Sequence, residues 1–528
     1  MQSIIRRSLL PLAYFLIALA VYSPALRGEL ILDDWGYITE NPWITTTASP
    51  WLFWTRLDQI DYYPLSYTWY WIAWRLFGLN TLSYHLVNVA LHAGVATLIA
   101  SLFRELWQSK SVLLGALAGL IFLLHPQNVP AVAWIVQSKT LLATFLALAA
   151  TLLYLRERYL WAVVLFALGL GAKASVVSLP AWLFLVAKRE RKAIVPILMM
   201  AVVAMISAGL ASYVNRHAVA NVKPLLERVY EVPSNLLFYL RGFLIPTQTA
   251  FVHPLRPIDF SVAWTTVAAV LLGGICYWIY RRRARLTGIY YALSFYLLAL
   301  LPAIGLVPSQ YMRVSSVADH YAYFANAGLA ILCCHLVFVR WLLPIFLIWC
   351  TSLTWSYAGD FATEERIWRQ TAIRTPSSAF VWYNLGTVLD KKTNLAEAHA
   401  SFQKATIEDP DHLLAHFNLA GVAIKLSNYQ EAEAELRKVI GLNPRYAPGY
   451  ANLAHAVFMQ GHLVEAITIA RDGVNTADPD ADLWIYLCRL EAQNHNFEAA
   501  KDACDQALRI APSNQTAREL RTRLDGVN

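Results

Sequence analysis

The chain has 528 residues, of which 57% are hydrophobic and only 15% carry a charge. So apolar a composition excludes a soluble protein of this length and is typical of a chain that lies largely in a membrane. The net charge of +8 does not indicate nucleic-acid binding, because residues 1–359 carry a net +13 and residues 360–528 a net −5. We therefore expect an integral membrane protein with no nucleic-acid partner.

The first predicted element is an apolar segment at residues 9–25. It is long enough to cross a hydrocarbon core of about 30 Å, and Arg6 and Arg7 before it predict a cytoplasmic N-terminus. A cleaved signal peptide is the alternative, but the apolar core is long and no clear small-residue cleavage site follows it. With an uncleaved anchor, Asp33 and Asp34 emerge directly beyond this segment on the far side of the membrane.

Further apolar stretches follow, and the short connections between them carry most of the excess Lys and Arg, which places these connections in the cytoplasm. Several stretches are shorter than the usual length of about 17 to 25 residues, so we expect broken helices near Pro126, Gly171 and Pro180. The stretch 234–246 is interpreted as re-entrant or interfacial. The sequence thus predicts an all-α membrane bundle over residues 1–358 with about eleven spans, at 9–25, 84–103, 113–124, 138–155, 160–171, 174–187, 193–213, 262–280, 287–306, 321–339 and 342–357.

The first long external loop, residues 27–81, contains Asp33 and Asp34 and an unusual density of aromatic residues. Such a composition is typical of amphipathic helices that lie in the membrane interface. A second long external loop, at about residues 215–261, contains His253.

From residue 379 the sequence repeats with a period of 34, the length of a tetratricopeptide repeat (TPR). Small residues recur where the two helices of a repeat touch, and proline recurs near the end of each unit. We therefore predict an extracytoplasmic TPR α-solenoid over residues 359–528, with about four repeats, a partial first repeat at Trp368 and a polar cap at 515–528. The first full repeat carries the pattern at Trp382, Leu385, Gly386, Ala398, Phe402, Ala405 and Pro410.

The six cysteines show no CxxC or Cys/His metal spacing, so we expect no metal site from them. Cys488 and Cys504 occupy positions in the fourth repeat that lie on helices that pack together. In an oxidising exterior they could form a disulfide, and the alternative is a reduced pair packed in the core.

Few ionisable groups are expected inside or beside the membrane and outside the basic loops. Because each is costly to bury in lipid, each is expected to face the bundle interior or an aqueous cavity. His85, Asn88 and His92 share one helix face, which either joins helices by hydrogen bonds or forms the wall of a site. The ionisable groups are Asp33, Asp34, Lys139, Lys173, Arg313, Asp319, His85, His92, His125 and His320.

The chain resembles the transmembrane and tetratricopeptide repeat family of O-mannosyltransferases, which belongs to the GT-C glycosyltransferases. The resemblance covers nearly the whole chain in order. It rests on the TPR units and on LDDWGYITENP (32–42), YYPLSY (62–67), YHLVNVALHA (84–93), HPQNVPAVAWIVQSKTLL (125–142), AKASVVSLPA (172–181) and ADHYAYFANAG (318–328).

This resemblance implies transfer of a sugar from a polyprenyl-phosphate donor to a hydroxyl acceptor on the extracytoplasmic side, with inversion at the anomeric carbon. The acidic motif of the family corresponds to Asp33 and Asp34, and its basic position in the fourth span to Lys139. The sequence departs from the family at His320, where the family has arginine, and at Ala174, where a glutamate often follows the lysine. These departures concern the binding of the donor phosphate.

The residue types fit this chemistry independently. A hydroxyl nucleophile needs a carboxylate within about 3 Å to accept its proton, and the leaving phosphate needs fixed cations. Adjacent side chains on an extended segment point to opposite sides, so one aspartate should face the acceptor and the other the donor or the loop. Asp33 is favoured as the base, although a helix cap or surface carboxylates remain the alternative for both aspartates.

For the donor phosphate and sugar, we predict contacts from Lys139, Lys173, Arg313, His320, His125 and Tyr63, and a site wall of His85, Asn88, His92 and Asp319. Lipid headgroups are an alternative partner for Arg313. The sequence assigns no cofactor and leaves open whether the reaction needs a divalent cation. The lipid-linked sugar is a substrate.

Three functions compete. The first is a glycosyltransferase whose TPR domain binds a protein or peptide acceptor, in contact with membrane lipids and most simply in a bacterial inner membrane. The second is a membrane scaffold without catalytic activity, which the acidic pair argues against. The third is a transporter of lipid-linked sugars, for which we would expect repeated halves in the membrane region.

Overall fold

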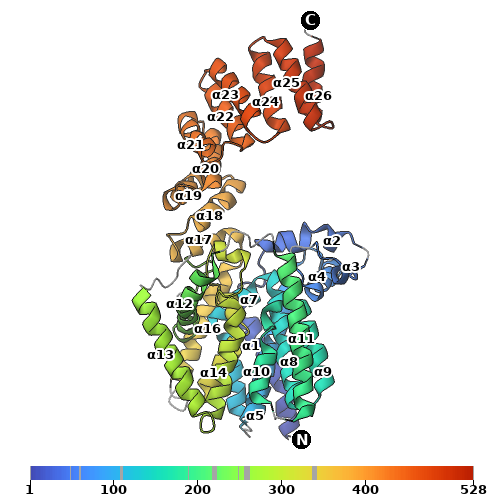
Figure 1. The fold of residues 1–528 in the computed structure, drawn as a ribbon, viewed down its shortest axis with the longest axis vertical. Coiled ribbons are helices and arrows are strands. Elements are labelled where there is room, and N and C mark those ends of the chain that lie inside the picture. Colours follow the sequence, from blue (N-terminus) through green and yellow to red (C-terminus); the bar gives the residue numbers. More distant parts are fainter. Residues whose placement is uncertain are drawn as a thin grey trace. The chain divides into compact units, whose positions relative to one another are not determined.

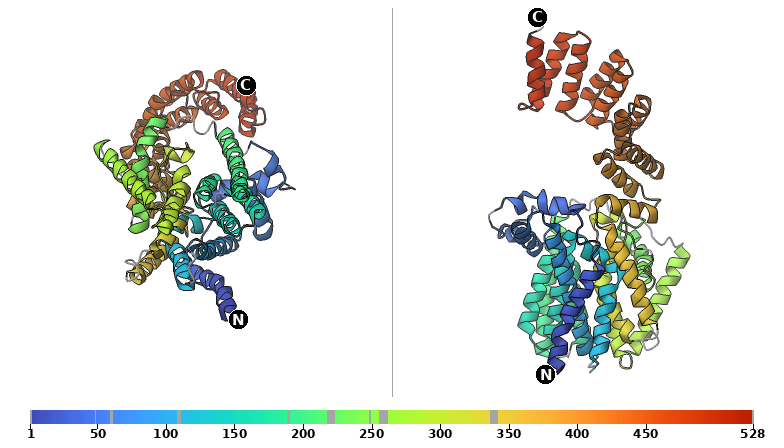
Figure 2. Two further views of the ribbon diagram at one scale, coloured as in Figure 1. Left: turned by 60° about the horizontal axis from the view of Figure 1, so that its bottom comes forward. Right: turned by 180° about the vertical axis from the view of Figure 1, so that it is seen from behind.

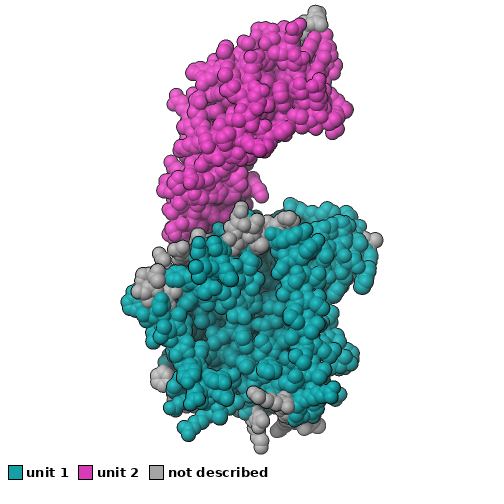
Figure 3. All heavy atoms as spheres, viewed as in Figure 1, with its two compact units in different colours: residues 1–374 teal, residues 375–528 magenta. Residues whose placement is uncertain are grey.

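The computed structural model describes residues 2–47, 49–58, 61–107, 111–187, 190–216, 223–247, 249–254, 262–335 and 342–526. Within these ranges the secondary structure is helical with no strand, which confirms the all-α prediction. The chain divides into two compact units, residues 1–374 and 375–528 (Figure 3). The repeat pattern placed Trp368 in the TPR region, but its helix α17 (Glu364–Arg374) groups with the first unit.

Each predicted span of the first unit overlaps a helix (Figure 1). Residues 336–341, which include the end of the predicted span 321–339, lie outside the described residues. The predicted stretch 234–246 overlaps the longer helix α12 (Leu225–Leu244). The helices at the predicted spans are α1 (Gln2–Val21), α5 (Thr81–Leu106), α6 (Val112–Leu124), α8 (Ser138–Leu155), α9 (Tyr159–Ala172), α10 (Leu179–Val186), α11 (Arg191–Val214), α13 (Val262–Arg281), α14 (Thr287–Leu300), α15 (Asn326–His335) and α16 (Leu343–Asp360).

The count of eleven spans is not confirmed. Among the described residues only three helical segments are long and apolar enough to cross a membrane: Thr81–Leu106, Ile135–Leu155 and Arg191–Val214. A fourth is reached if Val112–Leu124 and Pro126–Ala133, which meet at a bend of 58°, form one broken span. The other helices do not combine the required length with a sufficiently apolar window over the described residues. Helix α10, for example, has 8 residues, and at about 1.5 Å per residue it cannot cross a core of about 30 Å.

Helix α5 packs against α1, α6 and α8, which makes it a central element of the first unit. Two glycines on α6 explain the close approach of α5 and α6. A Cβ atom on Gly115 would lie 2.7 Å from the carbonyl oxygen of Ala100, and one on Gly119 would lie 2.6 Å from that of Ala96. Any larger residue would therefore force the two helices apart, as expected for small residues four positions apart at a tight helix interface.

The loop at residues 27–81 folds into short helices at the end of the bundle opposite the N-terminus of α1 (Figures 1 and 2). Two hydrogen bonds attach the longest of them, α4 (Pro64–Phe77), to the rest of the unit. The Tyr70 hydroxyl donates to the carbonyl of Val136 at 2.6 Å, and the Ser66 hydroxyl donates to that of Ala172 at 2.8 Å. This loop is thereby held over the ends of α8 and α9. The remaining helices are α2 (Pro42–Thr45) and α3 (Leu52–Thr55).

The second unit consists of helix pairs that stack in sequence along a curved array (Figure 2). Small residues permit the close pairing that the repeat pattern predicted. A Cβ on Gly386, for example, would lie 2.8 Å from the Phe402 ring. The pairs are α18 (Ala379–Lys391) with α19 (Leu395–Glu408), α20 (Leu413–Lys425) with α21 (Tyr429–Leu442), α22 (Ala447–Met459) with α23 (Leu463–Thr476), and α24 (Ala481–Gln493) with α25 (Phe497–Ile510), followed by α26 (Gln515–Asp525).

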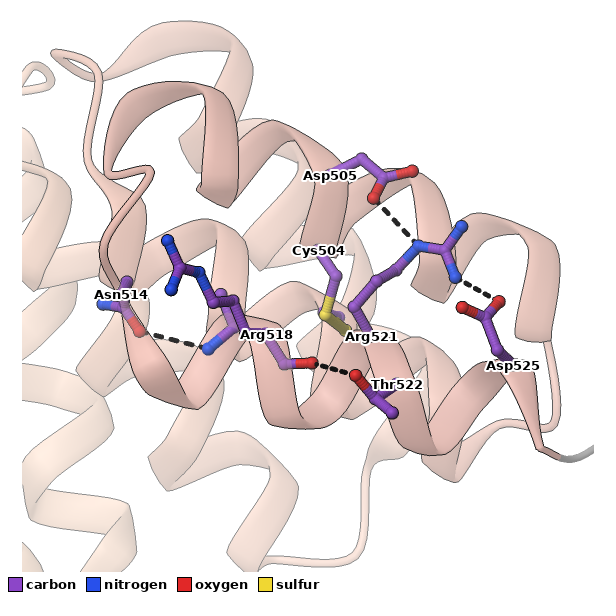
Figure 4. The surroundings of a disulfide bond; sticks show 9 residues. Cys504, Asp505, Asn514, Arg518, Arg521, Thr522 and Asp525 are labelled. Atoms are coloured by element: carbon purple, nitrogen blue, oxygen red, sulfur yellow. Dashed lines mark hydrogen bonds and ion pairs between the residues drawn. A yellow bond between two sulfur atoms is a disulfide. The ribbon is translucent and has the colours of Figure 1, made fainter.

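A disulfide joins Cys488 of α24 to Cys504 of α25, with 5.4 Å between their Cα atoms (Figure 4). Of the two possibilities that the sequence left open, the structure therefore contains the bonded pair. Next to it, Arg521 of α26 donates from Nε to Asp505 at 2.8 Å and also binds Asp525. The contact with Asp505 attaches the last helix to the fourth repeat, whereas that with Asp525 lies within α26.

Candidate active site

Asp34 is completely buried and is bound by the backbone at both carboxylate oxygens. Its Oδ1 accepts from the N–H of Val136 at 2.8 Å, and its Oδ2 accepts from the N–H of Ile31 at 3.1 Å. Burial raises the pKa of Asp34 to about 8 against these two hydrogen bonds, which favour the ionised form. The residue attaches the loop at residues 27–81 to the 3₁₀ turn η3 (Ile135–Gln137), immediately before α8.

Asp33 has different surroundings from Asp34, because its side chain is exposed to solvent. Desolvation by the surrounding protein raises the pKa of Asp33, Lys139 lowers it, and the negative charge of Asp61 raises it further. Asp33 is thus a reachable carboxylate with a cation and a second carboxylate nearby. Its partial protein environment suits a group that accepts a proton.

Lys139 and Lys173 are both buried, with 7% and 8% of their surface exposed, and they lie close enough to repel each other. The ammonium of Lys139 lies 4.3 Å from the centre of the Tyr37 ring and 6.0 Å from that of Tyr63. Lys173 donates to Thr140 Oγ1 at 2.8 Å and to Gln137 Oε1 at 3.3 Å.

Neither lysine forms an ion pair with a described residue. Burial lowers the pKa of Lys173 to about 7, and repulsion from Lys139 adds to this effect. Buried cations without a direct ion pair are costly, and an anionic ligand that binds both would reduce that cost.

His320 belongs to the turn η7 (Asp319–Ala322) and lies close to Lys139 and Lys173. Its ring is 4.5 Å from that of Tyr321 and 6.0 Å from that of Trp134. Burial lowers the pKa of His320 well below its usual value, and Lys173 and Lys139 lower it further. The imidazole is therefore neutral here, so it can offer a hydrogen bond to a ligand but no positive charge.

Asp61 is the main residue of this cluster that the sequence did not single out. It accepts a hydrogen bond of 2.5 Å from the hydroxyl of Tyr37, and its charge acts on Asp33 and Lys173. The available signal was its position directly before the YYPLSY motif. Tyr37 was likewise missed, although it lies within the LDDWGYITENP motif.

Other predicted residues lie outside this cluster. Asp319 binds His253 Nε2 at 3.0 Å and the N–H of Ala250 at 3.3 Å, so it holds the segment around Ala250. His125 is bound to the carbonyl of Phe243 at 2.9 Å and to the N–H of Gln127 at 3.2 Å. Both ring nitrogens of His125 are therefore occupied. Arg313 is exposed on the turn η6 (Gln310–Arg313).

The face of α5 that carries His85, Asn88 and His92, here called the stripe, connects helices. Asn88 donates to the carbonyls of Val132 at 3.2 Å and Trp134 at 3.3 Å. His92 lies 2.7 Å from the Tyr323 hydroxyl and 3.1 Å from the Leu123 carbonyl. These contacts favour the interpretation that the stripe joins helices. The third member, His85, is also buried, and its Nε2 has no hydrogen-bond partner in the described part of the chain.

Among the described residues, no group of three or more His, Cys, Asp and Glu side chains is placed to hold a metal ion.

The geometry defines an all-α protein in which an exposed carboxylate and two buried lysines meet at one end of a helical bundle, and which carries a helical repeat unit. The family model described as "Tetratricopeptide repeat" matches residues 383–447, which confirms the TPR prediction. Solved TPR structures give low scores. YrrB, titled a TPR protein with an unusual peptide-binding site, is 21% identical, with a TM-score of 0.27 over 30% of this chain and 82% of its own.

Curated proteins similar to this chain are named protein O-mannosyl-transferases. "Protein O-mannosyl-transferase F38B6.6" of Caenorhabditis elegans is 23% identical over 440 residues, which are 74% of this chain and 61% of that protein. "Protein O-mannosyl-transferase TMTC2" of Homo sapiens is 32% identical over 157 residues, 27% of this chain and 18% of that protein. The alignment therefore spans about three fifths of the worm protein. These similarities confirm the resemblance to the TMTC O-mannosyltransferases.

Proposed function

We propose that this protein is a membrane glycosyltransferase of the GT-C type that transfers a sugar from a polyprenyl-phosphate donor to a Ser or Thr hydroxyl of a protein. The observation that carries the proposal is the exposed Asp33 beside two buried lysines that form no ion pair with any described residue. The names of the similar proteins support a glycosyltransferase that acts on protein.

In the proposed reaction, Asp33 accepts the proton of the acceptor hydroxyl. At the same time, the oxygen of that hydroxyl forms a bond to the anomeric carbon. The bond from that carbon to the phosphate oxygen breaks, and its electron pair leaves with the polyprenyl phosphate. Because attack and departure occur on opposite faces of the sugar, the configuration inverts. Lys139 and Lys173 stabilise the negative charge that grows on the leaving phosphate.

The two aspartates have separate tasks in this mechanism. Both oxygens of Asp34 are occupied by backbone N–H groups, so Asp34 holds the loop against η3. Asp33 makes no such bonds with the described residues and is exposed to an incoming hydroxyl. This difference supports Asp33 as the base. His320 and Tyr63 lie near the lysines and are proposed to contact the donor.

The TPR unit is proposed to bind the acceptor polypeptide on the extracytoplasmic side, because the concave surface of such a solenoid suits an extended segment. The Cys488–Cys504 disulfide supports this side, since disulfides persist in oxidising compartments. A bacterial inner membrane fits both points. Labelling of cysteines introduced into residues 379–526 from the cytoplasmic side would contradict the proposed orientation.

The deciding experiment uses the purified full chain and radiolabelled polyprenyl-phosphate sugars, with a protein acceptor or with water. We expect transfer to the acceptor, and slow hydrolysis without it. A protein that binds the donor but releases no sugar in either assay would contradict the enzyme proposal. A protein that binds no donor would also contradict the proposed phosphate site.

A further inference from the structure

Asp61 is a half-buried residue of the loop at residues 27–81, and its charge acts on Lys173. Its carboxylate accepts the 2.5 Å hydrogen bond from Tyr37, and no described Lys or Arg forms an ion pair with it. Its charge is nonetheless close enough to favour the protonated form of Lys173 and to raise the pKa of Asp33. Asp61 therefore borders the site, but its direct bond is to a tyrosine.

Tyr37 connects Asp61 to Lys139. The Tyr37 ring stacks on Tyr67 at 6.0 Å and meets Tyr70 edge-on at 6.5 Å. Its other contact is the Lys139 ammonium, 4.3 Å from the ring centre. A cation at this distance from an aromatic ring is attracted by the negative charge of the ring face. The orientation of the ring thus influences where the ammonium rests.

We propose that Asp61 is a positioning residue for the donor phosphate. By holding the Tyr37 hydroxyl, it fixes the ring that locates the Lys139 ammonium, without touching the donor itself. This inference rests on the proposed function, because it assigns Lys139 to the phosphate of a lipid-linked donor.

The physical reason is the mobility of lysine. Its side chain is long and flexible, and its ammonium gains no fixed direction from a planar group as an arginine does. Lys139 has no ion pair with a described residue that would hold it, and its ammonium lies against the Tyr37 ring. A ring released from Asp61 can turn or shift, and small displacements of a binding group weaken binding markedly.

The test compares Asp61→Ala, Asp61→Asn, Tyr37→Phe and the double variant Asp61→Ala/Tyr37→Phe in the purified full chain. We expect Asp61→Ala and Tyr37→Phe each to raise the KM for the donor about tenfold, the value of one hydrogen bond to a charged group, with kcat changed less than about threefold. Asp61→Asn keeps an acceptor for the hydroxyl, so it should stay within about threefold of the native KM.

The double variant should be no worse than either single variant, because both substitutions break the same bond. Additive effects would overturn the inference. So would an unchanged donor KM in both Asp61→Ala and Tyr37→Phe, or a loss of kcat in Asp61→Asn as large as in Asp61→Ala, which would show that the charge itself acts in the reaction. Tyr37→Phe removes one oxygen atom from a packed ring, so it serves as the readout if Asp61→Ala does not fold.

Binding of polyprenyl phosphate without a sugar separates this inference from the proposed function. If the native protein transfers no sugar, the proposed function fails. The same four variants, ranked by their affinity for the lipid phosphate, still decide whether Asp61 acts through Tyr37. Asp58→Asn is the matched control, because Asp58 lies in the same loop, is exposed and pairs with Arg56 at the surface. It should leave both affinities unchanged.

Discussion

The two units differ in how some of their buried charges are paired. In the TPR unit, Glu491 is 1% exposed and is bound by Arg471, and the buried His416 lies 2.5 Å from Glu435. In the first unit, the buried Lys139 and Lys173 have no ion pair with any described residue, and Asp33 is exposed beside them.

This difference separates structural charge from functional charge. A buried charge with a partner is compatible with a stable repeat, whereas buried cations without one reduce stability unless a ligand supplies the opposite charge. Groups of this kind with strongly shifted pKa values are typical of sites that bind or react. The contrast therefore directs attention to one end of the first unit. Each of the following predictions tests either the charges of that site or the structural role of the TPR unit.

The largest effect is expected for Asp33→Asn. Loss of a positioned base typically costs about 10²- to 10⁴-fold in turnover, while an exposed loop carboxylate contributes little to folding. We therefore expect transfer to fall by at least about 100-fold, with donor affinity and thermal stability nearly unchanged. Turnover, donor binding and monodispersity are measured together, with Asp58→Asn as the control in the same loop. Near-native transfer by Asp33→Asn would refute the assignment of the base.

Replacing Asp34 instead should affect folding before chemistry. Asp34→Asn can accept at only one of the two positions now bound by Val136 and Ile31. Thermal stability and transfer are measured for both Asp33→Asn and Asp34→Asn. We expect Asp34→Asn to lose more stability relative to its loss of activity than Asp33→Asn does.

The next effect belongs to the TPR unit. The Cys488–Cys504 bond closes a loop with a sequence separation of 16 residues, and a disulfide across about 15 residues contributes about 3 kcal/mol. The double variant Cys488→Ser/Cys504→Ser should lower the free energy of unfolding of that unit by about this amount and leave donor binding intact. Thermal unfolding and limited proteolysis of the full chain measure the change, with Cys276→Ser as the control. Two free thiols in the non-reduced native protein, seen by mass spectrometry, would contradict the bond.

Sequence alone predicted the repeat unit well because each TPR contact recurs at a fixed spacing, as at Gly386 and Phe402. It also selected Asp33, Asp34, Lys139 and Lys173 as candidates, because ionisable groups are rare in an apolar chain, and their roles stay a prediction. It could not predict that the N–H of Val136 donates to Asp34, 102 residues away, or that the hydroxyl of Tyr37 donates to Asp61, because no local pattern encodes such pairings. The count of eleven spans is not confirmed, and hydropathy alone does not register where a stretch is divided into shorter helices, as between α9, which ends at Ala172, and α10, which begins at Leu179.

Lys139→Met tests the proposed phosphate site directly. A hydrogen bond between charged groups contributes about 1.5 to 3 kcal/mol, so donor affinity should fall by about 10- to 100-fold, and turnover should fall as well because the cation also stabilises the leaving phosphate. Methionine keeps much of the volume of the side chain, so folding should be retained. Lys192→Met is a suitable control, because Lys192 is exposed and pairs with Glu157. Equal donor affinity in Lys139→Met and the native protein would remove this lysine from the site.

The smallest effect is a pH dependence of donor binding that arises from Lys173. Its pKa is lowered to about 7, first by burial and then by repulsion from Lys139. Only the protonated amine attracts phosphate, so between pH 6 and pH 8 the affinity for polyprenyl phosphate should fall by about tenfold, which is the loss of protonation expected across this pKa. In Lys139→Met the repulsion is absent, so the pKa of Lys173 should rise. The fall in affinity for polyprenyl phosphate should then occur at higher pH, in addition to the weaker binding of this variant at every pH. In Lys173→Met this component should disappear. Binding titrations at several pH values measure all three profiles, and a Lys173→Met profile that keeps the native fall would show that another group titrates.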